Sequence, residues 1–310
     1  MRSLFIIGNG FDLDHKLPTS YEHFHKYLRK TYPGAKDMSP SYNISSTLMP
    51  DGEEVYDENE VASFLIDIIS KAEGYGDWKD FEASLGKLDL EEYLGDMAYW
   101  MDDENDDDDL WKSAYRNEDA SKHFYWVTIK IKDIFPKWID SISLRGVKPK
   151  KSFKNLIDRE NDIFLTFNYT RVLEDIYGAE NVIHIHGEQG GSIVIGHAEH
   201  RDQEFHYRYI GSEEYLEMIH SALRKNSESI ILEYSDFFEG LKDIDTIFSY
   251  GFSFSDVDLP YIMEIIRRIQ TDNVTWYLNS YDPEEKREEY KDKIKSCGFK
   301  GKFAIFTVNQ

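Results

Sequence analysis

The stretch Leu4-Phe5-Ile6-Ile7-Gly8-Asn9-Gly10-Phe11-Asp12 decides how the rest of this sequence is interpreted. Its four consecutive apolar residues predict a short buried strand, and the glycines after them predict a tight turn into a helix. Such a turn allows backbone N–H groups to approach a phosphate, which the positive end of the helix also attracts. The opening therefore predicts a strand–turn–helix unit that binds a nucleotide.

Short runs rich in β-branched and aromatic residues recur along the chain and predict further strands. They cover residues 163–167, 182–186, 193–195, 246–250, 275–278 and 303–308. Apolar residues at helical spacing lie between several of them, at residues 171–177, 212–224, 259–270 and 283–296. This alternation predicts an α/β fold that is Rossmann-like, with a largely parallel sheet flanked by helices.

A long segment without a convincing strand separates the first predicted strand from the others. Within residues 40–149, helical spacing over residues 58–73, 78–100 and 120–142 predicts helices. We therefore expect an α/β domain formed by residues 1–36 and 150–310, with residues 37–149 as a helical insertion. Residues 33–56 predict a loop or lid, and the acidic run at residues 102–109 predicts an exposed loop.

The composition excludes several classes of protein. The 310 residues include 36 basic and 59 acidic side chains, and the resulting net charge of −23 disfavours binding to nucleic acid or an anionic membrane. The chain has no signal-peptide pattern and no apolar stretch of about 18 residues, so we expect a cytoplasmic protein. Its single cysteine, Cys297, excludes a disulfide framework and a cysteine-based zinc module, and we expect this thiol to serve packing.

Four predicted strands end in polar sequence. These ends are Gly8-Asn9-Gly10, Thr166-Phe167-Asn168-Tyr169, His184-Ile185-His186-Gly187 and the segment from Tyr250 to Asp256. The carboxyl ends of parallel strands meet at one edge of a sheet, so the four ends predict one ligand crevice. Each also has a purely structural interpretation, as a tight turn, a helix cap at Asn168 or a core histidine. Leu13 stands where a third glycine is expected, so an ordinary dinucleotide-binding dehydrogenase is disfavoured.

The order of these motifs resembles two known families. Four segments resemble motifs of sirtuin-like domains and occur in the same order. The opening of these domains is similar to Gly8-Asn9-Gly10 with Leu17-Pro18, and their asparagine motif is similar to Thr166-Phe167-Asn168-Tyr169. Their His-Gly pair resembles His186-Gly187, and a late motif resembles Gly251-Phe252-Ser253-Phe254-Ser255-Asp256. Other segments are similar to sequence motifs of the bacteriophage abortive-infection AbiH family. These segments are Ile7–Asp12, Leu17–Tyr21, Trp78-x-x-Phe81-Glu82 and Phe167–Thr170. The resemblance spans most of the chain, although Thr170 stands where sirtuin-like relatives carry an acidic residue.

The resemblance implies a zinc-free sirtuin-like pocket for NAD and a role in phage defence. It implies that His186 and Asn168 are catalytic, in the hydrolysis of NAD⁺ to nicotinamide and ADP-ribose. The implied cofactor-binding residues are Gly8, Asn9, Gly10, Phe11, Asp12, Thr19, Thr166, Gly251, Ser253 and Asp256. The implied partners are NAD or a related nucleotide, a phage-derived trigger and further copies of the chain.

Two other functions stay open at this point. A metal-dependent phosphoesterase could use the carboxylates and imidazoles of Asp12, Asp14, His184, His186, His197 and His200. A non-catalytic nucleotide sensor could instead engage a partner through the aromatic residues Trp78, Phe81, Tyr99, Trp100 and Trp111, which a buried helical core explains equally well.

Overall fold

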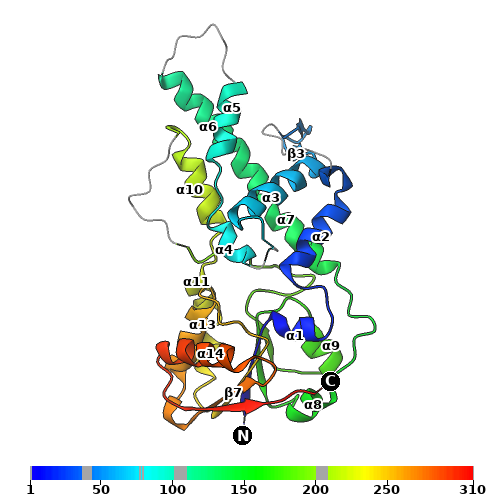
Figure 1. Ribbon diagram of the computed structural model, residues 1–310, viewed down its shortest axis with the longest axis vertical. Coiled ribbons are helices and arrows are strands. Elements are labelled where there is room, and N and C mark those ends of the chain that lie inside the picture. Colours follow the sequence, from blue (N-terminus) through cyan, green and yellow to red (C-terminus); the bar gives the residue numbers. More distant parts are fainter. Residues whose placement is uncertain are drawn as a thin grey trace. The chain divides into compact units, whose positions relative to one another are not determined.

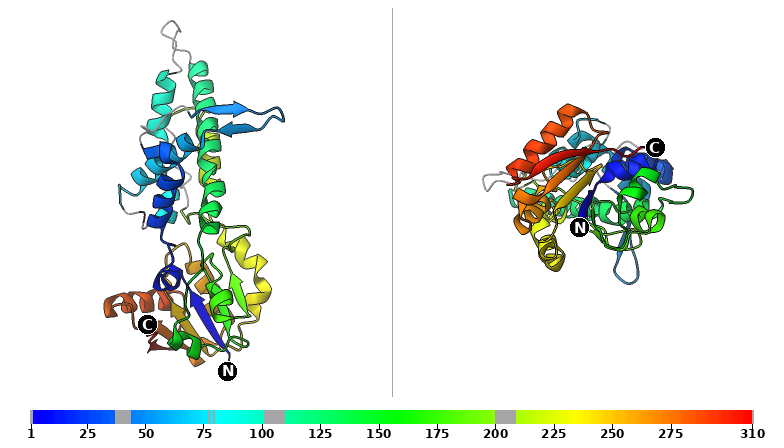
Figure 2. Two further views of the ribbon diagram at one scale, coloured as in Figure 1. Left: turned by 90° about the vertical axis from the view of Figure 1, so that its right-hand side faces the viewer. Right: turned by 90° about the horizontal axis from the view of Figure 1, so that it is seen from below.

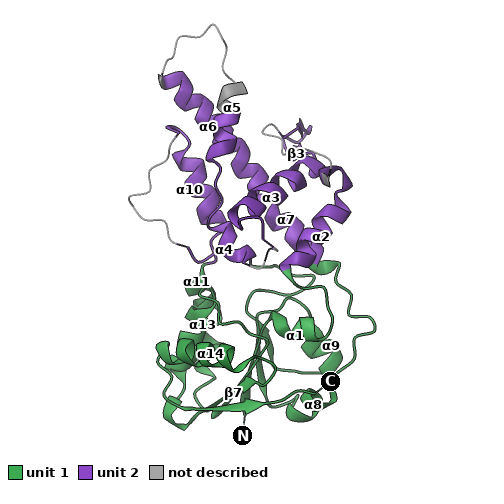
Figure 3. Ribbon diagram, in the orientation of Figure 1, with its two compact units in different colours: residues 1–20, 139–194, 226–310 green, residues 21–138, 195–225 purple. Residues whose placement is uncertain are grey.

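The computed structural model, shown in Figure 1 and Figure 2, describes residues 2–36, 44–76, 78, 80–100, 110–199 and 209–309. The chain divides into two compact units (Figure 3). The first unit contains Met1–Ser20, Ile139–Val194 and Asn226–Gln310, and the second contains Tyr21–Trp138 and Ile195–Lys225. The second unit thus combines most of the predicted insertion with a segment that the sequence assigns to the α/β domain.

A six-stranded sheet forms the centre of the first unit. Its strands are β1 (Ser3–Ile7), β4 (Ile163–Thr166), β5 (Val182–His184), β6 (Thr246–Tyr250), β7 (Thr275–Asn279) and β8 (Lys302–Phe306). They lie in the order β5-β4-β1-β6-β7-β8, and every neighbouring pair is parallel. This is the order of the doubly wound dinucleotide-binding fold, in which the chain changes direction across the sheet between β1 and β6. The predicted α/β fold with a parallel sheet flanked by helices is confirmed.

The helices of the first unit follow the strands. They are α1 (Asn9–Asp14), α8 (Lys151–Leu156), α9 (Val172–Tyr177), α11 (Ser227–Glu233), α12 (Ser235–Glu239), α13 (Leu259–Arg268) and α14 (Glu284–Ser296). Successive side chains of a strand point to opposite faces of the sheet. Leu4 and Ile6 of β1 accordingly join the core that α13 and α14 cover, to which Ile265 and Ile294 also belong.

Aromatic rings hold the opposite face of the sheet together. The Phe5 ring stacks on Phe164 with centroids 5.1 Å apart and on Phe248 with centroids 4.7 Å apart. Phe248 stacks in turn on Tyr277 at 4.7 Å, and each stacked pair is also a backbone register pair. Phe153 of α8 meets Phe5 edge to face and closes this side of the core. Offset stacking of this kind adds about 0.5–1.5 kcal/mol per pair to the burial of apolar surface.

The second unit is mainly helical. It contains α2 (Tyr21–Thr31), η1 (Pro33–Lys36), α3 (Glu58–Ala72), α4 (Phe81–Leu85), α5 (Glu91–Trp100), α6 (Leu110–Ile129), most of α7 (Ile131–Asp140) and α10 (Glu213–Ala222). Among the described residues, no helix is long and apolar enough to span a membrane. The predicted exposed loop at residues 102–109 lies outside the described residues.

Three local predictions are wrong. Residues 46–48 and 54–56, predicted as loop, pair as the antiparallel strands β2 (Ser46–Leu48) and β3 (Glu54–Tyr56) because the turn between them places Gly52 at φ +90°. The left view of Figure 2 shows this hairpin extending away from the helices of its unit. The helical patterns at residues 78–100 and 120–142 are each divided between two helices; in the first, Asp89 caps the new start by accepting a hydrogen bond from the Glu91 N–H.

The predicted strand at residues 193–195 is the third error. The Val194 N–H donates to the His186 carbonyl, and the Val194 carbonyl accepts from the Tyr169 hydroxyl. These bonds use the backbone groups that a sheet ladder would require. The apolar run therefore packs as a loop against the core of the first unit, with Val194 partly buried there.

Candidate functional site

Two glycine-containing turns contact each other where the strand order reverses. The Gly8 N–H donates to the Tyr250 carbonyl at 3.0 Å, and the Gly10 N–H donates to the Gly251 carbonyl at 2.9 Å. A Cβ on Gly251, whose φ is +63°, would lie 2.3 Å from the Phe11 nitrogen. Backbone contact between the turns therefore requires glycine here. It also places the Gly10 N–H inside the fold, where it does not face a ligand.

The segment after α1 is tied to the first turn. The exposed side chain of Asn9 donates from Nδ2 to the Thr19 carbonyl at 3.0 Å. Thr19 itself is buried, and its Oγ1 has no hydrogen-bond partner among the described residues. The two residues, both predicted to bind the cofactor, therefore differ in role. The Asn9 side chain holds the backbone at Thr19, whereas the Thr19 hydroxyl is buried and unsatisfied.

Asp12 and Asn168 form a buried polar cluster at the carboxyl end of the sheet. The Thr170 hydroxyl donates to Asp12 Oδ2 at 2.6 Å. Asp12 Oδ1 and both amide atoms of Asn168, Oδ1 and Nδ2, have no hydrogen-bond partner in the described part of the chain. Asp12 is 1% exposed and Asn168 is 5% exposed. Buried polar groups are nearly always bonded, so these unsatisfied atoms indicate a place that a ligand or water completes.

The environment of Asp12 changes its ionisation. Burial raises the pKa of this carboxyl from 3.8 to about 7, although the hydrogen bond from Thr170, the nearby side chain of Asn168 and the charge of His184 oppose the shift. A carboxyl group of this kind exchanges its proton near neutral pH. Strongly perturbed carboxyl groups are more frequent at functional sites than elsewhere.

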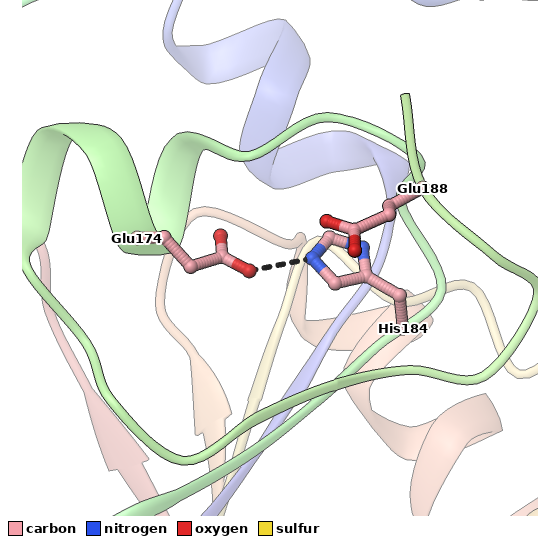
Figure 4. Close-up of side chains that lie close together, drawn as sticks. All are labelled: Glu174, His184 and Glu188. Carbon is pink, nitrogen blue, oxygen red and sulfur yellow. Dashed lines mark hydrogen bonds and ion pairs between the residues drawn. The ribbon is translucent and has the colours of Figure 1, made fainter. Parts of the chain in front are cut away.

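A charged pair fixes the loop that carries Asn168. His184 Nδ1 donates to the Asn168 carbonyl at 2.8 Å, and His184 Nε2 donates to Glu174 Oε1 at 2.8 Å (Figure 4). Since both partners are acceptors, both ring nitrogens carry a proton and His184 is a cation. Burial lowers the pKa of His184, but the Glu174 carboxylate outweighs it and the net shift is upward. The pair therefore holds the Asn168 backbone in place and brings a positive charge toward Asp12.

This geometry does not suit a metal ion. Among the described residues, the one group of histidine and acidic ligand atoms within 4.8 Å of one another is Glu174, His184 and Glu188. His184 has no lone pair to offer while both ring nitrogens donate, and Glu188 is bonded to Arg171. Figure 4 shows the Glu188 carboxylate beside the His184 ring with no hydrogen bond to it.

His186 lies at the matching position of the neighbouring strand end. Thr166 pairs with His184 in the sheet register, and Asn168 and His186 each follow two residues later. His186 is 3% exposed, and its Nε2 lies 3.2 Å from the Tyr261 hydroxyl and 3.9 Å from Asp258 Oδ1. Ser255 in turn donates to Asp258 Oδ2 at 2.9 Å. The imidazole is thus held by groups from α13 and the loop before it.

The family described as bacteriophage abortive infection AbiH matches residues 4–280. The chain belongs to the AbiH family. It is therefore an abortive-infection protein that acts against bacteriophage. No curated protein and no solved structure matches it significantly. The region shared with AbiH includes all four polar strand ends.

In this AbiH protein, the remaining residues predicted to bind the cofactor either have structural contacts or lie on the surface. Thr166 Oγ1 accepts from the Asn168 N–H at 3.1 Å and so positions the loop. The Phe11 ring is buried against Phe153 with centroids 5.3 Å apart. Ser253 and Asp256 are exposed, and Asp256 lies 3.4 Å from the Lys293 ammonium. The structure thus brings Asp12 and Asn168 together and leaves Ser253 and Asp256 on the surface.

The residues suggested as metal ligands of a phosphoesterase do not form one cluster among the described residues. Asp14 accepts from Lys150 Nζ at 2.7 Å and from the Tyr250 hydroxyl, so its carboxylate joins α1 to α8 and β6. His197 belongs to the second unit, where its Nε2 donates to the His220 carbonyl at 3.0 Å, and His200 lies outside the described residues. These positions do not favour a metal site in AbiH at this edge of the sheet.

The aromatic residues suggested for a partner surface differ in their exposure to solvent. Trp78 and Phe81 are fully buried, with Phe24 packed against both. Trp111 is 74% exposed. The side chains of Tyr99 and Trp100 lie outside the described residues. Trp78 and Phe81 therefore belong to the core of the second unit.

Sequence reasoning gave no site role to several residues that contact the candidate site residues. Glu174, Thr170, Asp258 and Tyr261 each contact a predicted site residue. Asp258 follows the predicted Asp256 by two residues and is 8% exposed. Asp258 lies at the N-cap of α13, where aspartate is favoured, so the sequence could have indicated a helix start there. Only the packing shows that its carboxylate faces His186.

Proposed function

We propose that this AbiH protein binds NAD⁺ and hydrolyses the bond between nicotinamide and ribose. The observation that carries the proposal is the buried, unsatisfied amide of Asn168 at the carboxyl end of a sheet with dinucleotide-binding strand order. The resemblance of the Asn168 and His186 motifs to sirtuin-like domains supports NAD⁺ as the ligand. Loss of NAD⁺ would stop the growth of an infected cell, which agrees with the abortive-infection role of the family.

The chemistry needs little covalent help from the protein. Nicotinamide is a cationic substituent of the ribose, so it departs as a neutral molecule through an oxocarbenium-like state while water attacks the ribose carbon. Asn168 offers one acceptor and two donor hydrogens to the ribose hydroxyls and to that water. His186, fixed by Tyr261, would accept a proton from a ribose hydroxyl or from the water.

The test is a direct assay of the purified protein with NAD⁺, alone and with an extract of phage-infected cells. Nicotinamide and ADP-ribose are measured by chromatography and mass spectrometry. Asn168→Ala and His186→Ala should each lower the rate by a factor of about 100 or more. Asn155→Ala, an exposed asparagine on α8, is the matched control and should leave the rate unchanged.

Two results would count against hydrolysis. If the protein neither binds NAD⁺ nor releases nicotinamide under both conditions, the proposed function is wrong. If NAD⁺ binds tightly without turnover and His186→Ala binds it equally well, the site is a nucleotide sensor.

A further inference from the structure

The carboxyl group of Asp12 is bonded through only one of its two oxygens. Thr170 holds Oδ2 at 2.6 Å, whereas Oδ1 is buried and has no hydrogen-bond partner among the described residues. Leaving a buried carboxylate oxygen unsatisfied is unfavourable, because the oxygen has lost its water and gained no hydrogen bond in return. The neighbouring Asn168 amide is also unsatisfied. The unsatisfied oxygen and the unsatisfied amide thus belong to neighbouring side chains at the carboxyl end of the sheet.

We infer that Asp12 is the catalytic base that takes the proton of the attacking water, with its carboxylate held by Thr170 and the water oriented by Asn168. The inference rests on the proposed hydrolysis of NAD⁺. It assigns Asp12 a different role from that of a cofactor-binding residue, and it leaves His186 to act on the ribose hydroxyls. His186 contacts Tyr261 on α13 and Asp258 just before it, whereas Asp12 contacts Thr170, so different residues hold the two groups.

The step balances without any further reactant. The bond between the ribose C1′ and the nicotinamide nitrogen breaks, and its electron pair leaves with nicotinamide. The water oxygen forms the new bond to C1′, while one of its protons moves to Asp12 Oδ1. Asp12 later releases this proton to solvent, so that NAD⁺ and water yield nicotinamide, ADP-ribose and one proton.

The charges around Asp12 suit a base that works near neutral pH. His184 is the titratable side chain that faces it, and its positive charge favours the carboxylate form. Burial favours the protonated form more strongly and raises the pKa of Asp12 to about 7. Because a base acts in its deprotonated form, the rate should rise as pH increases through about 7.

Asp162 provides a matched control for substitution of Asp12. It is also buried, but its Oδ1 accepts from the Ser3 N–H at 3.0 Å and its Oδ2 accepts from the Asp158 N–H at 2.8 Å. It directly precedes β4, at the opposite edge of the sheet from Asn168. Asp162→Asn therefore changes a satisfied structural carboxylate, whereas Asp12→Asn changes the unsatisfied one.

The experiment measures kcat and KM for NAD⁺ between pH 5 and 9, together with ADP-ribose binding by calorimetry. Asp12→Asn should lower kcat by a factor of about 100 or more and change ADP-ribose affinity by less than about threefold. Asp162→Asn should keep the wild-type kcat per folded molecule. Thr170→Val removes a bond that favours the carboxylate form, so the rising limb of its pH profile should move to higher pH, while Thr170→Ser should keep the wild-type profile.

The outcomes separate this inference from the proposed function. If the wild type hydrolyses NAD⁺ and Asp12→Asn keeps both its kcat and its pH profile, Asp12 is not the base. If Asp12→Asn loses ADP-ribose binding together with activity, Asp12 binds the ligand and the inference is overturned. If the wild type itself neither binds nor cleaves NAD⁺, the proposed function fails first, and the assignment of Asp12 fails with it.

Discussion

Replacing Asp12 by asparagine should stabilise the folded protein, and the gain should increase with pH. In the folded protein the pKa of Asp12 is about 7, whereas 3.8 is the value expected for an unburied aspartate. Between these pH values the unfolded chain has released its proton and the folded chain has not. The stability that comes with the protonated carboxyl is therefore complete below pH 3.8 and is lost as pH rises through 7.

The size of the effect follows from the two pKa values. Each pH unit in this window costs the wild type about 1.4 kcal/mol of unfolding free energy. The accumulated cost is about 2 kcal/mol at pH 5.5 and levels off at about 4 kcal/mol by pH 8.5. Asparagine has the shape of the protonated carboxyl group and does not titrate. The advantage of Asp12→Asn should hence grow by about 2 kcal/mol between pH 5.5 and 8.5.

Urea denaturation of both proteins at the two pH values measures this difference. Circular dichroism follows the unfolding of the whole chain, and Trp276, which is fully buried, contributes a fluorescence signal from the first unit, to which Asp12 belongs. Comparing the two pH values removes any pH-independent difference in packing between aspartate and asparagine. A stability difference that stays the same at pH 5.5 and 8.5 would refute the reasoning, since Asp12 would then titrate alike in the folded and unfolded states.

Three further perturbations test separate parts of the fold. Gly251→Ala should cost about 3 kcal/mol or more, measured by urea denaturation, because the residue has positive φ and no room for a Cβ. Lys225→Met should cost about 3–5 kcal/mol because it leaves the carboxylate of Glu82, 2.9 Å from the Lys225 ammonium, without this cation. Glu174→Gln should lower the pKa of His184 in an NMR titration, and its loss of stability should be largest below pH 6.5, where His184 is charged in both states.

Controls for these three perturbations come from the same chain. Gly190→Ala also changes a glycine at positive φ, but nothing lies near its Cβ, so it should cost only about 1 kcal/mol. An equal cost at Gly251 would show that the turns can separate. Adding Glu82→Leu to Lys225→Met should recover most of the loss if the ion pair is the cause. A His184 pKa that does not move in Glu174→Gln would contradict the charged pair.

The positions of the strands could be predicted well from the sequence. The apolar runs at residues 4–7, 163–167 and 246–250 correspond closely to β1, β4 and β6. A buried parallel strand has both faces covered, so nearly all of its residues are apolar and local sequence is enough to reveal it. The run at residues 193–195 has the same composition and is a loop. What distinguishes it is the bonding of the Val194 backbone to His186 and Tyr169, which a short apolar run does not reveal.

The candidate site could be predicted only in part. Asn168 and His186 stand out in the sequence because polar residues directly follow apolar strands. The contacts of these residues could not be predicted, since only the packing brings Asp258 and Tyr261 to His186. Gly10 shows the opposite case. It has the sequence context of a phosphate-binding glycine, but its N–H donates to Gly251.

The sequence by itself determined that this AbiH protein has a parallel α/β fold and that polar residues gather at one edge of its sheet. Short-range patterns carry this information because burial and backbone geometry act on a few neighbouring residues. Tertiary structure decided which polar atoms are satisfied. Asp12 and Thr170 are 158 positions apart in sequence, and only their contact leaves one carboxylate oxygen bonded and the other open. The ionisation of Asp12 depends on burial by the whole unit, which no local pattern encodes.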